Sequence, residues 1–155
     1  MDESKDLIGY AGVYVDVDDA KVDFDVIKEA HRTSWIGTYD AALFTKTPEG
    51  KVKVLNIDST ERTTGAKAGA IVGGVLGAIF PPSILLSAGV GAAYGAAVGN
   101  VAKGFGKGDI KDVGERLNPG ETGILLIADA TFDAGAEKLM KKAKKFAKQV
   151  VAAEM

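Results

Sequence analysis

Glycine recurs at every fourth position through the middle of the chain. The glycines are Gly65, Gly69, Gly73 and Gly77 in a first series and Gly91, Gly95 and Gly99 in a second. On an α-helix this spacing aligns them along one face. Glycine costs about 1 kcal/mol relative to alanine inside a helix, so such faces are favoured only where another helix packs closely against them. The spacing therefore predicts helices that pack through a glycine zipper.

An uncharged segment, residues 68–102, contains most of this pattern. Pro81 and Pro82 divide it and predict the turn of a helical hairpin. The first arm, residues 68–80, reaches roughly 20 Å, short of a hydrocarbon core of roughly 30 Å, whereas the second arm, 83–102, is long enough to span it. The segment fits a hairpin that enters a bilayer from the cytoplasmic side, and it fits equally a hairpin buried in a soluble oligomer.

Outside this insert the pattern of residues predicts an α+β domain. Strands are expected at 9–16, 39–45, 51–57 and 122–129, and helices at about 18–34, at 109–117 and from about 131 to the C-terminus. Without the insert this is the βαββαβ order of a ferredoxin-like sandwich, an antiparallel sheet with two helices on one face, followed by an extra C-terminal helix. The chain thus divides into residues 1–61 as the first half of the α+β domain, 62–108 as the inserted hairpin, and 109–155 as the second half.

The fourth expected strand is apolar on both faces between Ile124 and Ala128. Such a strand belongs in the centre of a sheet with cover above and below. We expect the final helix, the insert or a second subunit to supply the second cover.

The final helix is expected to be basic and amphipathic. Its apolar stripe is Leu139, Ala143, Phe146, Ala147 and Val150, and the lysines beside the stripe include Lys138, Lys141, Lys142 and Lys145. These four lysines are candidates for contact with anionic lipid. In the alternative, the stripe packs on the sheet or on another subunit and the lysines are solvated.

Three segments carry a resemblance to a known family. They are the glycine-rich segment 64–77, the Phe80-Pro81-Pro82-Ser83 turn, and the segment 103–115 with its Lys103-Gly104 and Asp109–Glu115 portions. The chain resembles the bacterial family known as domain of unknown function twelve sixty-nine from about Leu7 to the final helix. Members of that family are often described as predicted membrane proteins. The resemblance supports the architecture and implies no activity.

Residues typical of catalysis or metal binding are few. The chain has no cysteine, and its single histidine, His31, lacks a companion and is expected on the surface of the first helix. Five aspartates, Asp16, Asp18, Asp19, Asp23 and Asp25, lack the glycine and glutamate of a calcium loop and are expected to cap that helix and line its solvated face. Asp109, Asp112 and Glu115 are expected on the surface of the short helix. We therefore expect no catalytic residue, metal or cofactor.

Charge bears on partners and location. The formal net charge is −2, and the positive charge is not gathered on one face with interleaved aromatic residues, which argues against a nucleic-acid reader. The acidic N-terminus lacks the apolar stretch of a signal peptide, and the absence of cysteine suits a reducing compartment. We expect a cytoplasmic protein, peripheral to the membrane or inserted in it by the hairpin.

These features favour a non-enzymatic, self-assembling protein whose partner is a second copy of itself, in association with an anionic membrane. The alternative is a small-molecule sensor or binding module built on a ferredoxin-like dimer, by analogy of fold alone. An enzyme ranks third.

Overall fold

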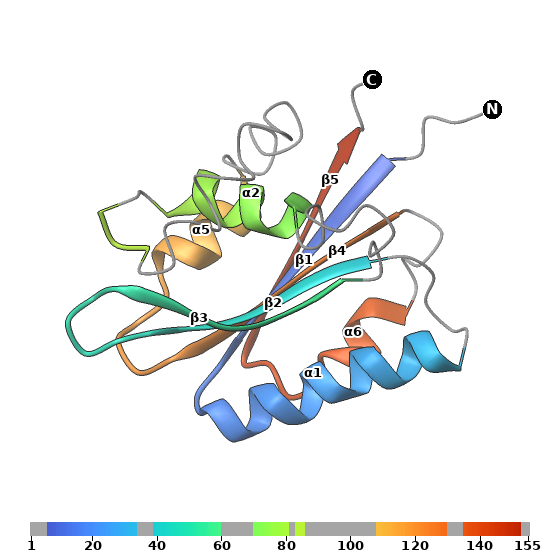
Figure 1. Ribbon diagram of the computed structural model, residues 1–155, viewed down its shortest axis with the longest axis horizontal. Helices are drawn as coiled ribbons and strands as arrows, with labels where there is room; N and C mark the ends of the chain where they lie inside the picture. The colour runs from blue at the N-terminus through green and yellow to red at the C-terminus, as the bar shows by residue number, and fades with distance from the viewer. Residues whose placement is uncertain are drawn as a thin grey trace.

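Five antiparallel strands form the centre of the computed structural model, in the order β3-β2-β4-β1-β5 (Figure 1). The structure describes residues 6–33, 39–59, 70–80, 83–85, 108–129 and 135–152. The strands are β1 Asp6–Tyr14, β2 Tyr39–Lys46, β3 Val52–Ser59, β4 Thr122–Asp129 and β5 Lys145–Ala152. The helices are α1 Val17–Arg32, α2 Ala70–Ile79, α5 Asp109–Glu115 and α6 Ala136–Leu139. The expected α+β class is confirmed.

Strand β4 lies in the middle of the sheet and is covered on both faces, as its sequence predicts. Ile124 and Leu126 pack in the core beneath α1 and α6, whereas Leu125 and Ile127 pack in the core beneath α2 and α5. Helix α2 belongs to the glycine-rich insert, so the insert supplies the second cover together with α5 (Figure 1). A second subunit is not needed to cover the sheet.

The β2–β3 hairpin is confirmed, with its connection where the proline and glycine predict it. Thr47 N donates to Lys51 O at 2.7 Å across the turn. Gly50 has a φ of +85°, a conformation that residues with a side chain rarely adopt, so glycine suits this position. The register shifts between Leu43 and Phe44, which marks an irregularity in the edge strand β3.

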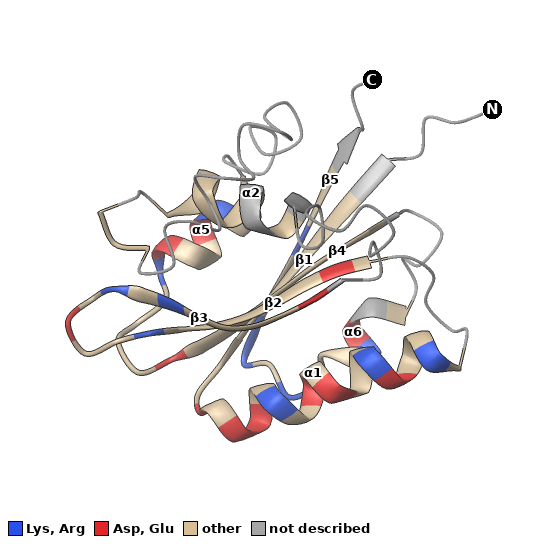
Figure 2. Ribbon diagram, in the orientation of Figure 1, with Lys and Arg blue, Asp and Glu red and all other residues tan. Residues whose placement is uncertain are grey.

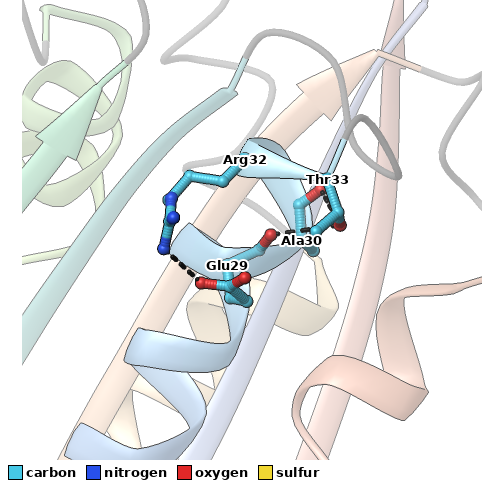
Figure 3. Close-up of polar contacts among 4 residues, drawn as sticks. All are labelled: Glu29, Ala30, Arg32 and Thr33. Atoms are coloured by element: carbon cyan, nitrogen blue, oxygen red, sulfur yellow. Dashed lines mark hydrogen bonds and ion pairs between the residues drawn. The ribbon is translucent and has the colours of Figure 1, made fainter.

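Helix α1 begins at Val17, and its N-cap lies two to three residues before Asp18 or Asp19, the caps that the acidic cluster predicts. The observed N-cap is Asp16, whose Oδ1 accepts from Asp19 N at 2.9 Å. At the other end the Thr33 hydroxyl donates to Glu29 O and Ala30 O, and Arg32 pairs with the Glu29 carboxylate at 2.7 Å (Figure 3). The two hydroxyl contacts reach backbone carbonyl groups of the last helical turn, and the ion pair joins two side chains one turn apart.

The prediction of a long C-terminal helix is wrong. Helix α6 has four residues, and the chain then forms β5, which pairs with β1 from Asp6↔Ala152 to Val13↔Lys145. The segment forms a strand despite its apolar residues at helical spacing. The pairing satisfies the N–H and C=O groups of β1, which would otherwise be an open edge of the sheet.

The arrangement of both helices on one face, as in a ferredoxin-like sandwich, is also wrong. Helices α1 and α6 lie on one face of the sheet, and α2 and α5 lie on the other (Figure 1).

Candidate functional site

Helix α2 carries the part of the glycine pattern that the structure describes, and its large apolar residues face the sheet. Val72, Val75, Leu76 and Ile79 are all buried and follow the i, i+3, i+4, i+7 spacing of a helix face. This face packs on the sheet. No residue of α2 is charged.

A buried carboxylate fixes the start of α2. Asp40 on β2 is only 4% exposed, and its Oδ2 accepts from Val72 N at 3.4 Å. The first N–H groups of a helix have no partner within the helix, and a carboxylate there also interacts favourably with the helix dipole. The cap therefore comes from a distant strand, and the local sequence gave no sign of it.

Two glycines of the first series, Gly73 and Gly77, lie on α2. At 3.6 residues per turn, Gly73 and Gly77 lie roughly 100° and 140° around the helix from Val72, whereas the other buried positions lie within roughly 60° of it. Gly77 is half-buried. The other predicted packing glycines, Gly65, Gly69, Gly91, Gly95 and Gly99, and the turn residues Pro81 and Pro82 lie outside the described residues.

Gly114 on α5 belongs to neither glycine series, and it makes a close contact with the end of α2. A Cβ atom built on Gly114 of α5 would lie 2.6 Å from Ile79 Cγ2 and 3.4 Å from Phe80 Cζ. Phe80 also packs edge-on against Phe44 of β2, with 5.7 Å between ring centroids. Gly114 thus lets α5 approach the end of α2. Gly114 is part of no repeat, so the spacing of glycines in the sequence did not indicate its role.

The candidate lipid-facing lysines do not share one helix face. Lys138 lies on α6, Lys141 and Lys142 in the turn after it, and Lys145 on β5. All four are exposed. Helix α6 lies beside α1, along which acidic and basic residues alternate (Figure 2). The lysines therefore form a cluster spread over a turn and a strand, next to a surface of mixed charge.

One of the five N-terminal aspartates is buried, although all five were expected to be solvated or to cap the helix. Asp23 is 1% exposed, and its Oδ2 accepts from the Tyr14 hydroxyl and from Lys142 N, both at 2.9 Å. Burial and the Asp23 carboxylate raise the pKa of Tyr14 well above its ordinary value. Asp23 thus joins α1, the end of β1 and the turn before β5.

The remaining titratable candidates lie apart from one another. His31 is exposed near the end of α1, where its ring meets Tyr39 edge-on at 5.5 Å. Asp109, Asp112 and Glu115 are exposed on α5. Within the described residues, no group of three or more histidine, cysteine or acidic side chains is placed to hold a metal ion. Within the same residues, no helix has the length and apolar character needed to cross a membrane.

A model of the family described as protein of unknown function (DUF1269) matches residues 66–155, more than half of the chain. The chain belongs to the DUF1269 family. The resemblance seen in the sequence is thereby confirmed, and the DUF1269 match includes α2, α5, β4, α6 and β5. No curated protein and no solved structure matches the chain.

Proposed function

We propose that this chain is a non-enzymatic protein that self-assembles through the glycine face of α2. The observation that carries the proposal is the orientation of that helix. Its large apolar residues contact the sheet, and at 3.6 residues per turn the positions of Gly73 and Gly77 fall on another side of the helix.

Physical chemistry favours a helix as the occupant of that face. Each glycine lowers helix stability by about 1 kcal/mol relative to alanine, and close backbone approach offsets this through van der Waals contact. The face carries no charge, so a second helix can meet it without desolvating an ionised group. We propose that the partner helices come from glycine hairpins of neighbouring copies.

The test compares three variants of the full-length protein by sedimentation velocity. Gly73→Leu should convert the assembly to a smaller species with unchanged far-UV circular dichroism, because leucine blocks the close approach. Gly73→Ala should weaken the assembly, although alanine at an open helix position would stabilise the chain by about 1 kcal/mol. The control Lys21→Leu places the same large side chain on the exposed side of α1 and should leave the assembly intact.

Two results would overturn the proposal. One is a wild-type chain that is monomeric at micromolar concentration. The other is an assembly whose size survives Gly73→Leu and Gly77→Leu alike.

We further propose that the assembly attaches reversibly to anionic membranes through Lys138, Lys141 and Lys142. Each lysine near an anionic surface contributes on the order of 1 kcal/mol, so the attachment should weaken steeply with salt. Binding to vesicles that contain phosphatidylserine should fall when these three are changed to glutamine. It should persist when Lys21, Lys28 and Lys53 are changed instead, and equal loss in both triple variants would contradict this part of the proposal.

The alternative of a ligand site between paired sheets has less support. In the described residues the two sheet faces are covered by α1 and α6 and by α2 and α5, so neither is open for another sheet.

A further inference from the structure

A cleft of about 420 Å³ opens where the end of β2, the end of α2 and α5 meet. Among the residues that the structure describes, its apolar lining includes Ile79, Phe80 and Ile84, and its charged lining consists of Lys46, Lys111 and Glu115. The volume lies within the range typical of small-molecule sites, which are mostly apolar with a few polar groups.

Tight packing holds the apolar wall in place. Ile79 and Phe80 are 4% and 2% exposed, and both pack against Gly114. Phe80 is also held by its ring contact with Phe44. A wall formed by such residues keeps its shape without a ligand, so a bound molecule would lose little free energy in ordering the protein.

The polar wall has unused donors. Lys46 Nζ donates to Leu117 O at 3.0 Å, the one contact described for this ammonium group, which has three N–H donors. Lys111 Nζ lies 3.1 Å from Glu115 Oε2 and 3.5 Å from Ile79 O. Of these two lysines, Lys46 therefore has more capacity to bind a further acceptor.

The charges select the kind of acceptor. Two lysines and one glutamate give the lining a formal charge of +1, and the Lys111–Glu115 pair is internally balanced. One negative charge on a ligand would neutralise the lining, whereas a dianion such as a phosphate monoester would leave excess negative charge beside Glu115. The carbonyl groups at the C-terminal ends of α2 and α5 carry partial negative charge. They therefore disfavour a dianion more than a monoanion.

We propose that this cleft binds an amphipathic monocarboxylate, with the carboxylate on Lys46 and the apolar body against Ile79, Phe80 and Ile84. The cleft is lined by residues of one chain, one of which, Gly77, also belongs to the proposed assembly face.

The experiment is calorimetric titration of the full-length protein with decanoate. Decanoate should bind, while acetate, which lacks the apolar body, and decanol, which lacks the charge, should bind at least about tenfold more weakly. Decyl phosphate should also bind more weakly than decanoate. Tighter binding of decanol or of decyl phosphate would overturn the proposal.

Variants locate the site. Lys46→Met keeps the aliphatic stem and removes the ammonium group, and it should weaken decanoate binding about tenfold. Ala78→Phe, at a half-buried position on the cleft wall, should block binding by filling the space. Lys21→Met, at an exposed position on α1 on the opposite side of the sheet, is the matched control and should bind like the wild type.

Three outcomes would exclude the site. They are no decanoate binding at about 1 mM, unchanged binding in both Lys46→Met and Ala78→Phe, and equal losses in Lys46→Met and Lys21→Met.

Discussion

Replacing Asp23 by alanine should destabilise the fold strongly, because its carboxylate is a buried acceptor for two separate segments. The change would leave the Tyr14 hydroxyl and Lys142 N without their partner. A buried donor without a partner costs about 1–3 kcal/mol, so the two together should cost about 2–6 kcal/mol. A domain of this kind has a total stability of about 5–15 kcal/mol, so this loss is a large fraction of it.

Conservative variants separate the two contacts. Tyr14→Phe removes one hydrogen bond to a charged acceptor and should cost about 1.5–3 kcal/mol. Asp23→Asn retains an acceptor oxygen of the same shape and should cost less than Asp23→Ala. The double variant Tyr14→Phe with Asp23→Ala should be less destabilised than the sum of the single variants, because the two side chains share one bond.

Urea unfolding at one protein concentration measures these differences, since assembly would otherwise shift the apparent stability. The melting temperature of Asp23→Ala should fall by roughly 10 °C at about 2–4 °C per kcal/mol. The matched control is Asp25→Ala, an exposed position on the same helix whose contact with Lys28 is 4.0 Å long, and it should change stability by less than about 0.5 kcal/mol. Equal effects of Asp23→Ala and Asp25→Ala would refute the reasoning.

Three further predictions concern pH and helix packing. The raised pKa of Tyr14 favours the neutral phenol in the fold, so its stabilisation is intact below the unfolded value of about 10 and is lost above it. Wild type should therefore lose stability above pH 10 more steeply than Tyr14→Phe, and parallel urea-unfolding curves would count against this. Burial raises the pKa of Glu121, but hydrogen bonds from Lys144 and Asn118 outweigh it and lower the pKa overall, so Glu121→Gln should be less stable than wild type at pH 7. That difference should begin to close below the ordinary glutamate pKa of about 4.3 and be lost as the pH falls through the lower pKa of folded Glu121, and a constant difference in acid unfolding would contradict the assignment. Gly114→Ala should destabilise by about 1–2 kcal/mol in thermal unfolding despite the higher helix propensity of alanine, because its Cβ would overlap Ile79; a gain in stability would show that the α2–α5 contact is loose.

Much of the sheet could be predicted from local sequence. The β2–β3 hairpin is predicted by two β-rich runs around a proline and a glycine. Strand β4 is recognisable as central because Ile124 to Ala128 are apolar on both faces, and burial on both faces is a property of that segment alone. Helix α1 and the short helix α5 have regular apolar spacing with acidic residues in their first turns.

What only the tertiary structure decided depends on partners far away in the chain. Residues 145–152 have apolar residues at helical spacing and no regular alternation, yet they form a strand because the edge of β1 offers backbone partners along its length. The burial of Asp23 follows from Tyr14 and Lys142 N, which lie on other segments, and the role of Gly114 follows from the approach of Ile79. The periodicity of the sequence indicates which face of a helix or strand is apolar. Backbone pairing and close contacts depend instead on which other helix or strand packs beside it, and that neighbour is determined only when the chain folds.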